Sequence, residues 1–463
     1  MVGSRRPTKL KLLLFVTLSL ISGCATYTAN PLPEGPDLAP QPTSLTIDLD
    51  QLAKPIAGLR PQVLDFTDGL DMTEVVSLAV LNNPELKALR MRSQVARAQL
   101  FAAGLLPDPQ LSLSFDHTTG GLPPLTNAFG LGLSADLQAL ITRDVAQAAQ
   151  VQAARQVDLE VLWQEWQVAQ RARLLFVRSL AEMQLLEVAT TARNFLAHRY
   201  AQSSQALRDG DVTIDTAATD LVGLTDADTR LREIKRRINR TRYDLGILLG
   251  LAPGARLVFS EPQPLRPFSR AEFANALNDL PARRPDLVAL QAGYESQQQL
   301  VRQAILSQFP ALNVGFNRAR DTGAVTSVGF GINISLPLFN RNRGDIAVQR
   351  ATRAQLRAEY QARLDTAFVD AQRAWTTMRL LSRQLRAARA RLPALAMMTA
   401  KARYGFDSGA LDPLVFLTLE TNLLAKRSEV IRLEQSLREA QVGLETLLGI
   451  TLDPRWTELK KPS

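Results

Sequence analysis

The chain contains two copies of one pattern, in which an alternating strand hairpin interrupts long helical runs. Three landmarks recur in the same order: Asn83–Leu86 as Arg284–Leu287, Gly130–Leu137 as Gly329–Leu336, and Leu248–Gly250 as Leu447–Gly449. The last two are shifted by 199 positions (329 − 130 and 449 − 250), so the helical stretch between them keeps its length. A duplicated unit of this kind cannot close its sheet alone, which indicates a symmetric, membrane-spanning assembly.

The N-terminus has the pattern of an export signal. Basic residues precede an apolar run, residues 12–21, and the small residues Ser22 and Gly23 follow it. The run is too short to span a bilayer, which takes about 20 residues. We therefore expect residues 1–23 to be a removable signal peptide.

Cys24 is the single cysteine in the chain. Residues 21–24, Ile-Ser-Gly-Cys, resemble a bacterial lipobox, in which the cysteine becomes the acylated first residue of the mature protein. The alternative is a chance cysteine after an ordinary signal peptide. By resemblance to known lipoproteins, Ala25 at the next position favours the outer membrane over the inner one. A single cysteine also excludes an internal disulfide.

The charge balance does not indicate nucleic-acid binding. The formal net charge is +9, and four basic residues of the predicted leader reduce this to about +5 for the mature chain. The arginines are interleaved with acids along helical runs rather than gathered into one patch.

Four segments alternate strictly between apolar and small or polar residues, as strands do. They are centred on Leu111–Asp116, Phe129–Ser134, Leu312–Asn317 and Val328–Leu336. Each pair is joined by a polar, Gly-containing loop. One apolar face and one wet face are typical of a transmembrane barrel strand. A water-soluble sheet with one buried face alternates in the same way, so this pattern alone leaves both interpretations open.

Prolines, glycines and helix caps predict where the segments of the chain begin and end. The segments are a lipidated, extended, Pro-rich segment at 24–70, a first repeat at 71–250, a linker at 251–282, a second repeat at 283–450 and a tail at 451–463. The first repeat has strands at about 110–117 and 128–136 and long helices at about 143–206 and 212–249. The second has strands at about 311–318 and 326–336 and long helices at about 342–405 and 412–448. Pro393 should kink or interrupt the third of these helices.

At several of these motifs the chain resembles the TolC-type outer-membrane efflux channel family, in its lipoprotein branch. The matching residues are Asn83–Leu86, Ser335–Asn340, Arg403-Tyr404, Gly409 and the Leu-Leu-Gly that closes each copy. The resemblance implies an α+β membrane protein with four transmembrane strands and long antiparallel helices per chain. Three chains would form a 12-stranded β-barrel continuous with a periplasmic α-helical barrel. It also implies a periplasmic adaptor and an inner-membrane pump as partners.

The strand count agrees with a homotrimer. Four strands are too few for a closed barrel. Two chains would give eight strands, and an eight-stranded barrel is filled by its own side chains. Three chains give twelve, within the even-numbered range of outer-membrane barrels.

The sequence contains no catalytic, metal or cofactor constellation. His117 and His198 are far apart and lack acidic or cysteine neighbours at ligand spacing. No phosphate-binding or nucleophile-elbow motif occurs. Met397-Met398 is interpreted as helix packing. We therefore expect no enzyme activity, and the energy for transport must come from a partner.

Candidate pore residues are the aspartates of the two helix turns. The resemblance implies an acidic ring just after the turn glycine, but the matching positions after Gly409 are Val415 and Thr418. Five other acids lie in the turns: Asp209, Asp211, Asp215, Asp407 and Asp412. Threefold symmetry would make each a ring of three carboxylates, which favours cations. Ordinary turn and capping roles are the alternative.

The leading hypothesis is therefore an outer-membrane exit duct, lipid-anchored at Cys24, that conducts passively from an adaptor and pump to the outside. A periplasmic adaptor lipoprotein, which also carries long helical hairpins, is the alternative. A lipid-anchored coiled-coil scaffold is a third class, which the four alternating segments oppose.

Overall fold

The computed structural model describes residues 26–45, 69–120, 125–260 and 268–450. The predicted signal peptide, Cys24 and the predicted tail at 451–463 lie outside these residues. The chain divides into two units, Met1–Leu38 and Ala39–Ser463. In the first unit, residues 26–38 contain neither helix nor strand. The Pro-rich segment is not wholly extended, because a 3₁₀ turn, η1, occupies Pro42–Ser44 with proline at its first position.

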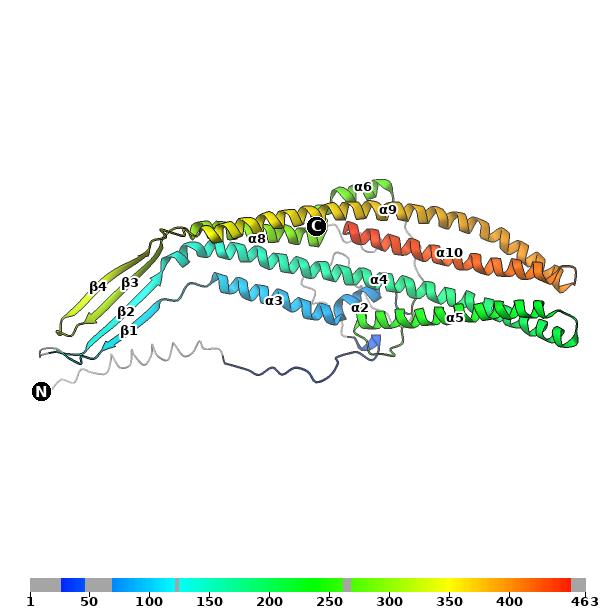
Figure 1. The fold of residues 1–463 in the computed structure, drawn as a ribbon, viewed down its shortest axis with the longest axis horizontal. Helices are drawn as coiled ribbons and strands as arrows, with labels where there is room; N and C mark the ends of the chain where they lie inside the picture. Colours follow the sequence, from blue (N-terminus) through cyan, green and yellow to red (C-terminus); the bar gives the residue numbers. More distant parts are fainter. Residues whose placement is uncertain (1–25, 46–68, 121–124, 261–267, 451–463) are drawn as a thin grey trace, which may run out of the picture. The chain divides into compact units, whose positions relative to one another are not determined.

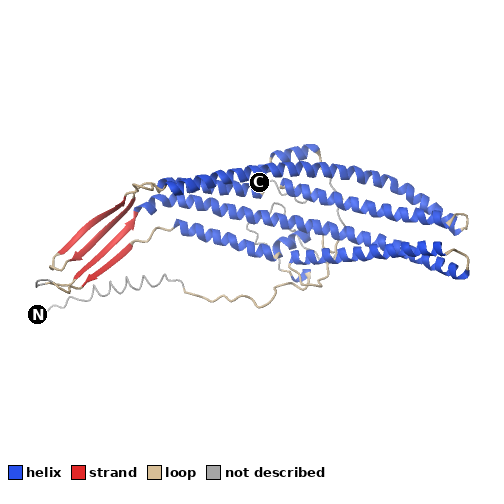
Figure 2. Ribbon diagram, in the orientation of Figure 1, coloured by secondary structure: helices blue, strands red, loops and turns tan. Residues whose placement is uncertain are grey.

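The second unit is mostly helical and carries one four-stranded sheet (Figure 2). The first copy comprises α2 (Met72–Asn82), α3 (Pro84–Gly104), β1 (Gln110–Asp116), β2 (Ala128–Asp136), α4 (Leu137–Asp209) and α5 (Ile214–Leu249). The second comprises α6 (Arg270–Asn278), α7 (Leu280–Arg283), α8 (Pro285–Leu306), β3 (Ala311–Arg320), β4 (Thr326–Ser335), α9 (Arg343–Asp407) and α10 (Pro413–Leu448). The four predicted strands and the long helices are therefore confirmed.

The sheet is antiparallel, with strand order β1-β2-β3-β4. Its central pair, β2 and β3, joins the two copies, with Leu133 opposite Phe316. Within the described chain, β1 and β4 each pair on one side only, so each presents an unpaired edge. Figure 1 shows the sheet at one end of the helices of this unit and both long helix turns at the other.

The longest helix, α4, has 73 residues and begins directly after β2. The predicted start at residue 143 is therefore six residues too late (143 − 137). Asp136, the last residue of β2, explains the earlier start, because its side chain accepts hydrogen bonds from the N–H groups of Gln138 and Ala139. No loop separates strand from helix at this junction, and the strand thereby fixes the direction in which the helix leaves the sheet.

Pro393 does not interrupt α9, which runs unbroken from Arg343 to Asp407. Proline leaves the carbonyl of the residue four positions earlier, Arg389, without its helical donor. Both residues are exposed, so the freed carbonyl lies on the side of the helix that solvent reaches. The prediction of an interruption was wrong because it took no account of which side of the helix the proline occupies.

The recurring sequence landmarks are in contact with each other within each copy. In the first, Asn83 caps α3 and donates to the carbonyl of Leu248 at 3.1 Å. Gly250 ends α5 with φ +71, and a Cβ there would lie 2.8 Å from the carbonyl oxygen of Asn82. In the second copy, Arg284 donates to the carbonyl of Leu447 at 3.3 Å. The Asn-Pro and Leu-Leu-Gly motifs thus belong to one helix-to-helix joint.

Each copy has its own hydrophobic core at this joint. The first is built on α2, α4 and α5 around Phe176 and Leu249. The second is built on α6–α10, with Phe273 stacked on Trp375 at a centroid distance of 4.9 Å. The N-terminal part of the second unit joins the first core, since Ala39 donates to the carbonyl of Gly250 at 3.0 Å.

The two copies are fastened together through α4, which packs against α8 and α10. Arg173 of α4 donates to Glu445 of α10, a fully buried carboxylate. A second pair between the same helices, Arg178 with Glu439 at 2.8 Å, is considerably more exposed. The buried pair therefore holds two charges out of water, and each requires the other.

We predict that Glu445→Gln destabilises the protein by about 3 kcal/mol, because it leaves the Arg173 charge buried without its counter-charge. Glu439→Gln is the matched control, since it removes an exposed pair on the same helices and should cost less than about 1 kcal/mol. Thermal unfolding followed by circular dichroism measures both. Equal effects of the two substitutions would show that burial does not distinguish the pairs.

Candidate channel site

One face of the sheet is apolar and exposed. The strand register places Leu111, Leu133, Phe316 and Phe330 side by side in one row across all four strands. Large apolar side chains on this face that are exposed in the chain are Leu111, Leu113, Phe115, Phe129, Leu131, Leu133, Phe316, Val328, Phe330, Ile332 and Ile334. None of the described helices covers them.

The opposite face carries small and polar residues. Ser112 lies opposite Gly132 and Asn317 lies opposite Gly329. These glycines leave room for the polar side chain of the neighbouring strand, because a Cβ at Gly329 would lie 2.7 Å from Oδ1 of Asn317. The predicted two-faced sheet is therefore present.

The exposure of the apolar face excludes a sheet whose apolar face is buried within the described part of the same chain. A water-soluble sheet buries its apolar face against other parts of the protein. Here Phe330 is 70 % exposed, and its row neighbours are also exposed. Among the described helices, none is long and apolar enough to cross a bilayer.

All five candidate aspartates are exposed at the two helix turns. Their individual roles are local ones: Asp209 accepts from Gln205, Asp412 caps α10 through the N–H of Leu414, Asp215 lies in the first turn of α5, and Asp407 ends α9. Asp211 lies in the turn after Gly210, which has φ +85. Among the described residues, no group of three or more His, Cys, Asp or Glu is placed to hold a metal ion.

Close to these turns, aromatic residues connect the two helical hairpins. Phe416 of α10 stacks on Phe406 of α9 at 5.0 Å and meets Phe195 of α4 edge-on at 5.8 Å. A cavity of about 320 Å³ lies beside them and is also lined by His198 and Arg403. The second of the two histidines, His117, contacts Asn127 at 2.8 Å near the loop end of the sheet. The structure therefore keeps the two histidines in separate regions.

Sequence reasoning missed two ion pairs near the turns. Arg199 lies 3.2 Å from Asp220 between α4 and α5, and Arg403 lies 3.4 Å from Glu420 between α9 and α10. Both acids are buried. The available signal was their position, because Asp220 continues the buried stripe that contains Ala217. An acid on an apolar stripe points to a partner on the facing helix.

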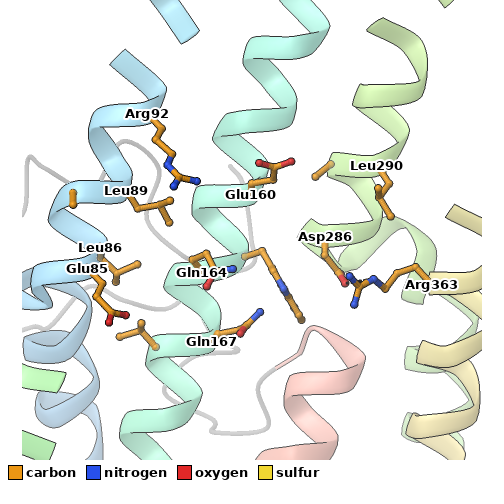
Figure 3. A pocket seen from close by; sticks show the side chains of 14 residues that line it. Glu85, Leu86, Leu89, Arg92, Glu160, Gln164, Gln167, Asp286, Leu290 and Arg363 are labelled. Carbon is orange, nitrogen blue, oxygen red and sulfur yellow. Dashed lines mark ion pairs between the residues drawn. The ribbon is translucent and has the colours of Figure 1, made fainter. Parts of the chain in front are cut away.

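A cavity of about 760 Å³ opens along α4 between α3 and α8 (Figure 3). Asp286 and Arg363 face each other on one side of it at 3.9 Å, and Glu85 and Arg92 come from α3 on the other. Trp163 on its floor lies under the guanidinium of Arg284 at 4.9 Å. The pair of Asp286 and Arg363 links α8 to α9 beside this cavity.

Glu182 of α4 is a buried acid with incomplete pairing. Burial raises the pKa of its carboxyl above the ordinary value of 4.5, while Thr241, Arg237 and Arg178 act in the opposite direction. Arg237 is 4.0 Å away, and Oε2 of Glu182 has no hydrogen-bond partner among the described residues. Desolvation therefore outweighs the attraction of the two arginines.

Comparison with known proteins agrees with this geometry. Residues 276–450 match the family described as outer membrane efflux protein. The chain is 24 % identical to the probable outer membrane lipoprotein SilC of Salmonella typhimurium, over 95 % of this chain and 98 % of SilC. It is 23 % identical to the cation efflux system protein CusC of Escherichia coli, over 81 % and 85 %.

Two solved structures show the same fold. The outer-membrane channel OprN superposes with a TM-score of 0.70 at 16 % identity, covering 93 % of this chain and all of OprN. CusC superposes with a TM-score of 0.66 at 18 % identity, covering 92 % of this chain and all of CusC.

A two-faced sheet joined to long helical hairpins is thus the fold that this chain shares with these channel proteins. The match to the outer membrane efflux protein family covers the second copy, residues 276–450, and relatives at 23–24 % identity extend the similarity over most of the chain. These similarities support an efflux channel of the outer membrane rather than an enzyme, and they do not support the adaptor alternative.

We predict that Glu182→Gln raises the melting temperature more at pH 7.5 than at pH 4.5. The folded state holds the Glu182 proton more tightly than the unfolded state does, because its folded pKa is raised. The contribution of this residue to stability therefore falls as the pH rises from below 4.5 through the raised value. Glu187→Gln, at an exposed position of the same helix, is the control. An equal change at both pH values would contradict the account.

Proposed function

We propose that three copies of this chain form an exit duct with a 12-stranded barrel in the outer membrane and an α-helical tunnel in the periplasm. The observation that carries the proposal is the combination of an exposed apolar face with two unpaired edges in one sheet. In lipid, every backbone polar group must be paired within the protein, so the edge of β1 requires the edge of β4 from another copy.

The dimensions of the strands suit this arrangement. β3 and β4 have 10 residues each. At about 3.3 Å per residue and a tilt of about 40°, such strands rise about 25 Å, the height of the apolar band of outer-membrane barrels. Twelve strands also leave a lumen, which eight would not.

The helices are long enough to serve as the tunnel wall. α4 spans about 110 Å if straight, at 1.5 Å per residue for 73 residues. Because the turns of α4–α5 and α9–α10 lie at the end away from the sheet, they would form the periplasmic entrance (Figure 1). Repetition in a trimer would turn Asp209, Asp211, Asp215, Asp407 and Asp412 into carboxylate rings there.

We further propose partners and an anchor. The duct would receive cargo from a periplasmic adaptor and an inner-membrane pump, which supply the energy. Acylation of Cys24 would add a lipid anchor, and the relative SilC is named a probable outer membrane lipoprotein. The relatives' names include cation efflux for CusC and pyoverdine export for OpmQ of Pseudomonas aeruginosa. These cargoes differ widely, so the proposal concerns the duct and not its cargo.

We predict that detergent-purified protein is trimeric and raises the conductance of planar bilayers, because three sheets close around a wet lumen. Cys24→Ala should remain embedded in the membrane, keep the trimer and conduct like the wild type, since the barrel and not the lipid holds the protein there. Chemical cross-linking, membrane extraction at alkaline pH and single-channel recording measure these properties.

Two outcomes would contradict the proposal. A monomer that stays in solution without detergent would exclude the barrel. Release of the Cys24→Ala variant from the membrane would show that the lipid alone anchors the chain, as in an adaptor.

A further inference from the structure

Two arginines break the apolar face of the sheet. Arg318 and Arg320 lie on the same face of β3 as Phe316, in the positions where the alternation calls for apolar residues. In the register, Arg318 stands between Leu131 and Val328, and Arg320 stands between Phe129 and Thr326. Apart from Thr326, the other residues on this face are apolar, so two cations there need a specific explanation.

Neither arginine has a partner in the described part of the chain. No ion pair or side-chain hydrogen bond involves Arg318 or Arg320 there, and Nε of Arg320 is buried without an acceptor. The adjacent acid, Asp321, directs Oδ1 to the N–H groups of Gly323 and Val325. Asp116, at the same end of the sheet, is opposite Ala128 on the other face. Both guanidinium groups are therefore left without a partner in the described part of the chain.

A neighbouring copy does not supply the missing acid at the sheet edge. β3 is an inner strand, flanked on both sides by β2 and β4 of the same chain. The edges available to another copy are those of β1 and β4, and each is separated from Arg318 by at least one strand. The groups that reach these arginines therefore come from whatever covers the apolar face.

The position of the two arginines along β3 indicates the depth at which they lie in the membrane. Arg318 and Arg320 end β3 at the loop side, away from the helices, whereas Leu312, Val314 and Phe316 occupy the side toward them. In the proposed duct the loop side faces outward. An arginine on the lipid face costs about 2–4 kcal/mol at the midplane but about 0–1 kcal/mol near the interface. Both side chains therefore belong at the level of the outer headgroups.

We propose that Arg318 and Arg320 form a binding site for the phosphate groups of lipid A, the phosphorylated glycolipid of the outer leaflet. Guanidinium binds phosphate through parallel N–H···O bonds in a fixed plane. The two residues are about 7 Å apart along the strand. Each arginine can therefore bind its own phosphate group, or both can bind the same one. Leu131, Phe129 and Val328 beside them suit the acyl chains below. The inference rests on the proposed function, since it requires the apolar face to contact lipid.

The test measures lipid retained by the purified trimer. Wild type, Arg318→Gln/Arg320→Gln, Arg318→Lys/Arg320→Lys and the control Arg379→Gln/Arg383→Gln are incubated in detergent with bisphosphorylated lipid A or with lipid A stripped of both phosphates. Arg379 and Arg383 are exposed on α9, so the control removes the same charge elsewhere. Lipid that stays bound after size exclusion is quantified by mass spectrometry, and each protein is recorded in planar bilayers.

We expect wild type and control to retain about tenfold more bisphosphorylated than stripped lipid A, and the double Gln variant to lose this difference. The Lys variant should keep part of it, because charge remains but the planar fork is lost. If the Gln variant does not fold, the Lys variant decides, because a preference equal to that of wild type and control would place the phosphate elsewhere.

Equal retention of the two lipids by a conducting wild type would overturn this proposal and leave the duct intact. Undiminished preference in the Gln variant would overturn it as well, by placing the phosphate elsewhere. A wild type that neither trimerises nor conducts would overturn the proposed function instead.

Discussion

The four-stranded sheet cannot be complete within one chain, and the rest of the molecule is arranged around that constraint. Its two edges present unpaired backbone groups, and its apolar face is covered by none of the described helices. Each deficiency is costly in water. Both are removed together when copies join edge to edge within lipid, so closure of the sheet and insertion into the membrane are one event in the proposed assembly.

The sheet determines where the helices lie. Because Asp136 is both the last residue of β2 and the cap of α4, the strand passes into the helix without a hinge. α4 then holds the second copy through α8 and α10, with the buried Arg173–Glu445 pair at the joint. A tilt of the strands is therefore transmitted to a helix of 73 residues, which suits a barrel and a tunnel that share one axis.

Much of this was predictable because its causes are local. Period-two alternation gives the strands, and Gly250 and Gly449 end helices because their left-handed backbone suits glycine. The start of α4 was missed because Asp136 had been assigned to a strand alone. The prediction that Pro393 interrupts α9 was wrong, because a carbonyl that loses its helical donor destabilises a helix only where solvent does not reach it. The pairs Arg199–Asp220 and Arg403–Glu420 depend on which helices face each other, and sequence periodicity does not specify that.

The sequence pattern also did not identify the arginines on the apolar face of β3. The third strand was predicted to end near residue 318, and the pairing of Arg320 with Thr326 shows that the strand continues to Arg320. The carboxylate rings at the turns remain a prediction, because the structure shows each aspartate in a single chain. Cys24 remains one as well, since it lies outside the described residues.

The central claim is that opposite faces of the sheet meet lipid and water in the assembled protein. Spin labels placed singly along β4 in bilayers, with oxygen and a water-soluble nickel chelate as relaxation agents, test it most directly. Labels at Val328, Phe330, Ile332 and Ile334 should respond to oxygen, and labels at Ser327, Asn333 and Ser335 should respond to the chelate. Equal access of the chelate to both sets, or shielding of the first set from oxygen, would contradict the account.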